Sequence, residues 1–145
     1  MPRFFQYITA PVGRLLLSAI FIASGANKIA DWGGTAERMR GEGMVFVPLF
    51  LFGAILFELV GGLSILVGWK ARLGALALIV FLVPVTLIFH DFWQYEGSER
   101  MMQMIQFMKN LAIMGGLFIV LTHGAGPASV DDCLCKTRRS DRDTS

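Results

Sequence analysis

The stretch from Met101 to Leu121 places the strongest constraint on the fold, because it is long and apolar enough to cross a bilayer. It nevertheless holds Lys109 and Asn110 in its interior. A charged side chain at the centre of a bilayer costs about 2.5–3.5 kcal/mol on insertion scales. Other segments must therefore supply polar partners for these two residues, and a bundle of membrane helices is able to do so.

Three further apolar segments have a similar length. Together the four segments predict an all-α membrane protein, a four-transmembrane-helix bundle with helices over residues 11–30, 47–68, 73–91 and 104–122. The composition agrees, because 54% of the 145 residues are hydrophobic and 17% are charged, whereas a soluble domain has about 25% charged residues. The segments lack the alternation of apolar and polar residues that a membrane barrel requires.

Basic residues are divided unevenly between the two sides of this bundle. One side receives Arg3, Arg14, Lys70, Arg72, Lys136, Arg138, Arg139 and Arg142. The other receives Arg38, Arg40 and Arg100, with Lys28 at its edge. Because cytoplasmic loops carry the excess of Lys and Arg, we predict that the N and C termini are cytoplasmic. Residues 1–124 then form the transmembrane domain, and residues 125–145 form a polar cytoplasmic tail that we expect to be disordered.

Two connections and the chain start carry weaker signals. The connection from Asp31 to Phe46 predicts a short surface helix around Thr35–Arg40, with Thr35 as its cap. No cleavable signal peptide is expected, because the first apolar run continues to Lys28 without a small-residue cleavage site.

Motifs for nucleic acid, metal or a bound redox group are not evident. The net charge is only +2, and no basic patch is interleaved with aromatic residues, so no nucleic-acid partner is expected. Cys133 and Cys135 form a C-x-C pair with no histidine nearby, and two ligands do not complete a tetrahedral metal site. We therefore expect no metal, and the role of the two cysteines stays open.

Five polar groups fall in the same half of the predicted bundle. At a rise of 1.5 Å per residue, Lys28 lies near the outer end of the first helix and Glu58 near the middle of the second. His90 ends the third helix, and Lys109 and Asn110 lie in the outer half of the fourth. Ionisable groups inside a membrane indicate a functional site, so we predict that these five residues form a ligand-binding polar cluster.

Each of the five also has a structural interpretation, which the sequence leaves open. Lys28 could extend toward the headgroups, and Glu58 could form a structural ion pair with Lys109 or Lys28. His90 could cap its helix, and Asn110 could simply join two helices. Elsewhere, Arg14 is expected to reach the headgroups or to cap the bundle. Small residues mark close helix packing, which we predict at Gly25, Gly61, Gly62, Gly115 and Gly116, with the two Gly-Gly pairs joining the second and fourth helices.

Five short motifs, in order along the chain, resemble the DoxX family. They are R-x6-F-I-x-x-G-x-x-K at residues 14–28, E-L-x-G-G-L-x-x-L-x-G at 58–68, H-x-F-W at 90–93, F-x-K-N-L-A-I-x-G-G-L at 107–117 and G-x-G-P-x-S-x-D at 124–131. The resemblance covers about residues 12–131. It implies a four-helix, multi-pass protein of the bacterial inner membrane. The residues with Cys133 and Cys135 lie beyond it.

The resemblance also suggests an activity. The family takes its name from a subunit associated with thiosulfate:quinone oxidoreductase, and other members are linked to oxidative stress, thiol-redox complexes and quinone resistance. A quinone carbonyl needs hydrogen-bond donors, which Lys28, His90, Lys109 and Asn110 could supply, and His90 or Glu58 could deliver protons. Because no haem, flavin or iron–sulfur ligand set is evident, electrons would come from a redox partner protein or a soluble substrate.

Three functions therefore stay open. The first is a quinone-interacting subunit or accessory of a membrane redox or oxidative-stress system. The second is a non-catalytic scaffold or assembly partner in the lipid bilayer. The third is a small transporter or lipid-binding module, which with four helices would need to form a homodimer. Whether the protein is an enzyme is undecided at this point.

Overall fold

The computed structural model describes residues 3–143, and within them it describes the side chains of residues 4–136. The helices in this part of the chain are α1 (Arg3–Ala30), α2 (Trp32–Gly41), α3 (Val47–Val67), α4 (Ala71–Phe89), the 3-10 turn η1 (Phe92–Gln94), α5 (Gly97–His123) and α6 (Val130–Asp143). Residues 3–143 contain no β-strand.

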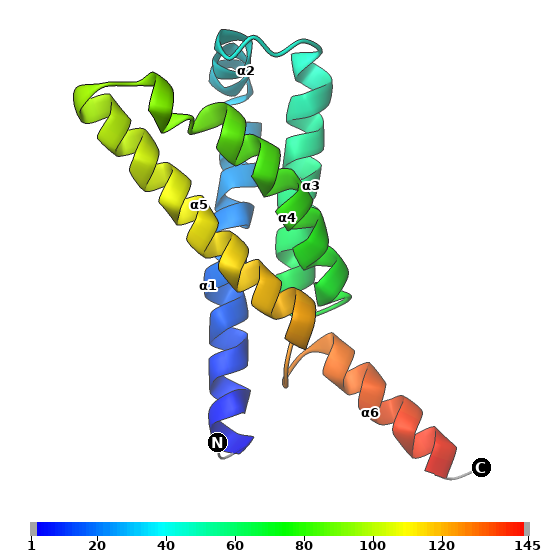
Figure 1. The fold of residues 1–145 in the computed structure, drawn as a ribbon. Helices are drawn as coiled ribbons and strands as arrows, with labels where there is room; N and C mark the ends of the chain where they lie inside the picture. Colours follow the sequence, from blue (N-terminus) through cyan, green and yellow to red (C-terminus); the bar gives the residue numbers. More distant parts are fainter. Residues whose placement is uncertain (1–2, 144–145) are drawn as a thin grey trace.

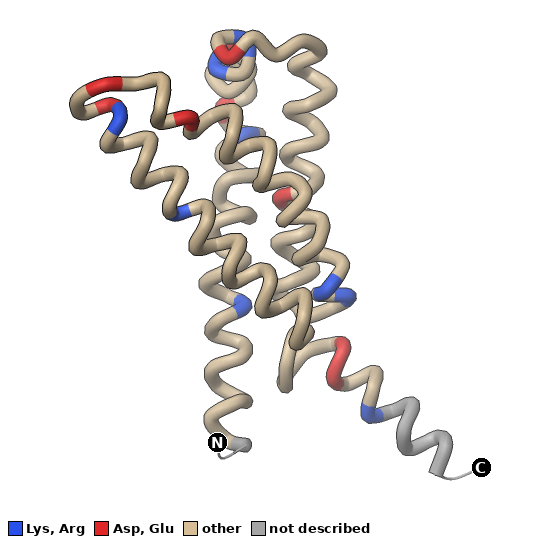
Figure 2. Tube along the Cα trace, in the orientation of Figure 1, with Lys and Arg blue, Asp and Glu red and all other residues tan. Residues whose placement is uncertain are grey.

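Four of these helices are long and apolar enough to cross a membrane. They cover Phe4–Ala30, Val47–Val67, Ala71–Gln94 and Gly97–His123. The predicted fold class is thereby confirmed. Both chain termini lie at the same end of the bundle, which we call the terminal end, and α2 and η1 lie at the opposite end, which we call the loop end (Figure 1). Charged residues gather mainly at these two ends (Figure 2).

Two helices extend further than predicted. Helix α1 begins at Arg3 and continues through Pro11, and α5 begins at Gly97 and so includes Glu99 and Arg100. The prediction followed the apolar residues, which mark the hydrocarbon core of the bilayer. A helix does not have to end where the core ends, because its backbone hydrogen bonds are internal.

The short helix at the loop end is also longer than predicted, and its cap is different. Asp31, not Thr35, caps α2, because the Asp31 Oδ1 atom accepts a hydrogen bond from the Gly34 amide at 3.1 Å. Ala36 and Met39 are buried in a cluster with residues of α3, namely Val47, Leu51 and Ile55. This apolar contact fixes α2 across the end of the bundle.

The four spans pack in a row rather than as a closed square. Helix α3 packs against both α1 and α4, and α5 packs mainly on α4 and η1. Helices α1 and α5 make few contacts and diverge toward the loop end (Figure 1). The main apolar core lies among the spans and consists of Phe21, Ile65, Ala75, Leu78, Ile79, Leu82 and Leu117. Large apolar side chains on the outer faces, such as Leu49 and Ile119, are exposed and suit contact with lipid.

Glycines hold α3 close to its two neighbours. A Cβ atom at Gly61 would lie 2.6 Å from the Leu78 side chain of α4, and one at Gly62 would lie 3.0 Å from Ile22 of α1. Gly25 of α1 likewise lies against Leu59. The glycines of α3 thus face α4 and α1, so the expected approach of the second and fourth spans through them is not found.

The two glycines of α5 differ from this pattern. A Cβ atom at Gly116 would lie 3.3 Å from Leu17 of α1, whereas one at Gly115 would have no atom within 4 Å. Gly116 therefore marks a close contact between α5 and α1. Gly115 makes no such contact in the single chain.

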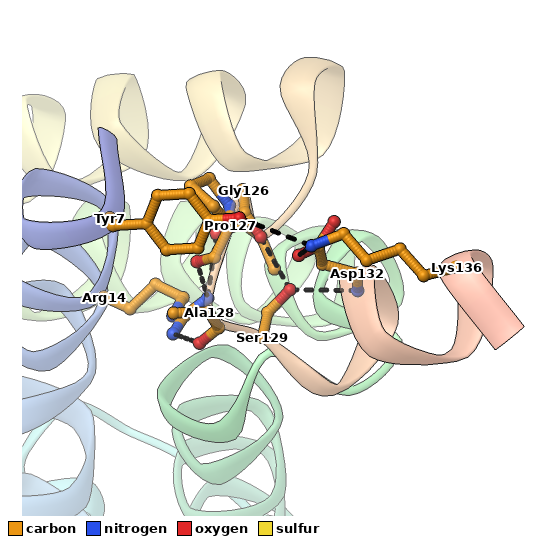
Figure 3. A network of polar contacts seen from close by, with 9 residues as sticks. Tyr7, Arg14, Gly126, Pro127, Ala128, Ser129, Asp132 and Lys136 are labelled. Atoms are coloured by element: carbon orange, nitrogen blue, oxygen red, sulfur yellow. Dashed lines mark hydrogen bonds and ion pairs between the residues drawn. The ribbon is translucent and has the colours of Figure 1, made fainter. Parts of the chain in front are cut away.

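The segment that follows α5 makes hydrogen bonds to the rest of the bundle, within the tail that the sequence predicts to be disordered. Residues 124–131, which we call the strap, cross the terminal end and include the first two residues of α6. The Arg14 guanidinium donates to the carbonyl oxygens of Ala125 at 2.9 Å and Ala128 at 2.6 Å (Figure 3). The Asp131 carboxylate accepts from the Lys70 and Ala71 amides at 2.9 and 3.1 Å. The strap therefore ties the end of α5 to α1 and to the α3–α4 turn.

Candidate functional site

An ion pair inside the membrane joins α1 to α3. Lys28 Nζ lies 2.9 Å from Glu58 Oε1, and the Ser24 hydroxyl donates to the same oxygen at 3.0 Å. Lys28 also donates to the Ser24 oxygen at 2.7 Å. The Glu58 side chain is 5% exposed, and its Oε2 atom is buried without a hydrogen-bond partner in the described structure. One oxygen of the carboxylate is thus satisfied, and the other is available to a donor.

A groove of 710 Å³ separates α1 from α5. Its α1 wall includes Gly13, Leu17 and Ile20, and its α5 wall includes Lys109, Ile113 and Gly116, with the strap at the terminal end. Among the described residues that line it, none is Asp or Glu. The groove is therefore an apolar channel with positive charge on its walls.

Lys109 lies at the loop end of this groove, whereas the Lys28–Glu58 pair lies between α1 and α3 and does not belong to the lining. Helices α1 and α5 are antiparallel and approach each other where Gly116 faces Leu17. Lys109 lies seven residues before Gly116 and Ser24 lies seven residues after Leu17, so both lie toward the loop end from this contact. Helical periodicity places Leu17, Ile20 and Ser24 on one stripe, with Lys28 at its edge. We call the loop end of the groove, beside Lys109, the groove mouth.

Lys109 has no acidic partner at this position. It is exposed and donates a hydrogen bond to the neutral side chain of Gln106, one turn nearer the loop end. Across the described part of the chain, no carboxylate lies within ion-pair distance of Lys109. The structure thus leaves a membrane cation facing the groove without a counter-ion.

Asn110 and His90 lie in a different place, the interface between α4 and α5. The Asn110 amide donates to the Thr86 hydroxyl at 3.0 Å, and this hydroxyl donates to the Leu82 carbonyl at 2.7 Å. His90 Nδ1 lies 2.9 Å from the Gln103 side-chain oxygen. Asn110 is 6% exposed, so it joins two helices and does not face a cavity. The five predicted residues therefore lie in three places: Lys28 with Glu58 between α1 and α3, Lys109 at the groove mouth, and His90 and Asn110 between α4 and α5.

Sequence reasoning missed Ser24, which completes the Lys28–Glu58 group. Ser24 precedes Lys28 by four residues, so helical spacing could have indicated it. The groove itself has no comparable signal, because it depends on the inclination of α5. In the described residues no group of three His, Cys, Asp or Glu side chains could hold a metal ion. The groove mouth offers hydrogen bonding from the Lys109 ammonium group, and the Lys28–Glu58 pair between α1 and α3 offers a carboxylate for proton exchange.

Comparisons with known proteins agree with this architecture. The DoxX family matches residues 10–91, which cover α1 to α4. The inner membrane protein YqjF of Escherichia coli K12 is 37% identical over 126 residues, which are 86% of this chain and 91% of that protein. The inner membrane protein YphA of the same organism is 28% identical over 120 residues, covering 83% and 86% of the two chains.

A eukaryotic protein shows a shorter similarity. The ER-derived vesicles protein ERV29 of Saccharomyces cerevisiae is 28% identical over 78 residues, which are 54% of this chain and 25% of that protein. No solved structure matches. The family match, the two bacterial relatives and the four spans lead to one conclusion: this chain is a multi-pass inner-membrane protein and belongs to the DoxX family.

Proposed function

We propose that this protein binds a quinone at the groove mouth and acts as a quinone-interacting accessory of a membrane redox system. The observation that supports the proposal most directly is Lys109, an ammonium group in a membrane span that lines an apolar groove and has no carboxylate within ion-pair distance in the described chain. Such a group needs an acceptor, and a quinone carbonyl is an acceptor that reaches proteins through the bilayer.

The groove has the shape and polarity that this ligand requires. Ligand sites are mostly apolar, with a few polar groups that fix the orientation of the ligand. With the quinone ring at the groove mouth, Lys109 donates to one carbonyl oxygen. The apolar tail lies along Leu17, Ile20 and Ile113 toward the strap.

Proton transfer is the second requirement of quinone chemistry. A bound quinone supplies the carbonyls that accept electrons and protons. Glu58 is a protonatable group whose Oε2 atom lacks a partner, and Lys28, at 23% side-chain exposure, links it to the surface of the bundle. Because the described chain offers no redox group of its own, the electrons come from a partner protein in this proposal. The chain then binds the quinone and supplies protons to it.

Extraction of the purified protein tests this proposal. We expect organic extracts of the wild-type protein to contain quinone, and Lys109→Gln to retain at most about one tenth as much, because a hydrogen bond to a charged group is worth about 1.5–3 kcal/mol. Lys70→Gln is the matched control, since Lys70 does not line the groove. Wild-type extracts without quinone, together with a stably co-purifying partner, would instead favour the scaffold function.

A further inference from the structure

We propose that the preferred ligand of the groove mouth carries a negative charge on its headgroup, as a deprotonated hydroxyquinone does. This inference rests on the proposed function and specifies the chemical class of the ligand. It follows from the uncompensated positive charge at the mouth. The neutral ring of an unsubstituted quinone does not neutralise this charge.

The charge at the mouth is positive. Lys109 is the charged residue that lines the mouth, and no carboxylate lies within ion-pair distance of it in the described part of the chain. The ammonium group of Lys28, by contrast, lies 2.9 Å from Glu58 and is compensated there. Further along the groove, no described lining residue is acidic, whereas Arg14 and His123 belong to the lining.

A membrane environment makes this imbalance important. Screening by water and salt is weak there, so an uncompensated cation interacts strongly with any anion that reaches it. The opposite arrangement, with Lys109 extending only toward headgroups at the loop end, would leave the groove without preference for charge. Gln106, which accepts a hydrogen bond from Lys109, supplies a dipole but no negative charge. An anionic oxygen in the mouth would neutralise Lys109 and leave the Lys28–Glu58 pair intact.

A pair of probes that differ in charge tests this inference. A hydroxynaphthoquinone with an alkyl chain is anionic at neutral pH, and its methyl ether has the same ring and chain but no charge. We expect the purified protein in detergent to bind the anionic probe at least roughly tenfold more tightly than the ether, as measured by fluorescence quenching or calorimetry. Lys109→Gln should abolish the preference, Lys109→Arg should keep it, and Lys70→Gln should leave it unchanged.

The outcomes separate this inference from the proposed function. Equal affinity of the wild-type protein for the two probes would overturn the inference and leave quinone binding in place. A preference that persists in Lys109→Gln would overturn the assignment of the charge to Lys109. If neither probe binds and the extracts contain no quinone, the proposed function itself is wrong. The comparison of the two probes on the wild-type protein requires no variant, so it remains decisive even if Lys109→Gln does not fold.

Discussion

At the scale of single residues, the Lys28–Glu58 ion pair is the polar contact inside the membrane whose loss we expect to lower the stability most. Removing one member of a buried pair leaves the other charge uncompensated, and this costs more than the pair contributes by its presence. Glu58 is the more sensitive member, because its side chain is 5% exposed and that of Lys28 is 23% exposed. Ser24 donates to the same carboxylate oxygen and would remain as a partial substitute.

We expect Lys28→Met to lower the free energy of unfolding by about 3 kcal/mol, at the low end of the range for broken buried pairs because Lys28 is partly exposed. The double variant Lys28→Met with Glu58→Leu should recover most of this loss, since no buried charge remains. Thermal unfolding in detergent micelles measures both effects, with Lys70→Met as the control for the loss of a lysine. A Lys28→Met protein as stable as the wild type would contradict the role of the pair.

The residue scale also shows what the sequence can predict about the site. Depth along each helix placed Lys28 and Glu58 at compatible heights, and their pairing was one of the alternatives considered. Lys109 and Asn110 were assigned to one cluster, but consecutive residues on a helix point about 100° apart. Asn110 faces α4, so Lys109 faces away from it, toward the groove. The packing of α5 decides which helix each of these two side chains faces. This packing could not be predicted from the sequence.

At the scale of elements, α3 packs against α1, α2 and α4, and its glycines determine how closely α1 and α4 approach it. Gly61 and Gly53 are both within α3, but only Gly61 lies against another helix. A Cβ atom at Gly61 would come within 2.6 Å of Leu78 on α4, whereas one at Gly53 would have no atom within 4 Å. The two positions therefore form a matched pair in one helix.

We expect Gly61→Ala to lower the free energy of unfolding by about 1–3 kcal/mol through overpacking against Leu78. Gly53→Ala should be neutral or should stabilise the protein by up to about 1 kcal/mol, because alanine favours the helix more than glycine does. Unfolding of the two variants in the same detergent provides the measurement. If both substitutions have the same effect, the close contact between α3 and α4 is not as the structure places it.

Elements outside the membrane were harder to predict than the spans. The four spans follow from apolar length alone, because the bilayer requires that length. The strap has polar residues and glycines that indicate a loop, and its order comes from partners far away in sequence. Arg14 lies more than a hundred residues from the carbonyls that it binds, and Asp131 caps a helix that begins sixty residues before it. Such contacts have no local signature, although the polar motif at residues 124–131 marks their location.

At the scale of the whole molecule, the groove results from the order in which the spans pack. Helix α3 lies between α1 and α4, and α5 packs mainly on α4, so α1 and α5 make few contacts and a groove lies between them. A closed bundle would have buried Lys109 beside another helix. The open arrangement lets one membrane cation face a groove that is accessible from the lipid, as the proposed binding of a membrane-soluble ligand requires.

The structure refines the count of basic residues from which the orientation of the molecule in the membrane is predicted. An even number of spans places both termini on one side. Two of the basic residues counted above are engaged inside the bundle, since Arg14 binds the strap and Lys28 pairs with Glu58. The remaining excess still lies at the terminal end: Arg3, Lys70, Arg72, Lys136, Arg138, Arg139 and Arg142 against Arg38, Arg40 and Arg100. The rule that basic loops face the cytoplasm then predicts a cytoplasmic terminal end.

Reporter fusions in the bacterial membrane test this orientation. An alkaline phosphatase domain, which is active only in the periplasm, should give no signal when fused after Ser145. The same domain inserted at Gly43, in the exposed connection between α2 and α3, should give a strong signal. A cytoplasm-active fluorescent reporter at the same two positions provides the control, because it should show the opposite pattern. Phosphatase activity from the C-terminal fusion would place the terminal end in the periplasm, and Lys109 would then face the groove from the cytoplasmic half of the bilayer.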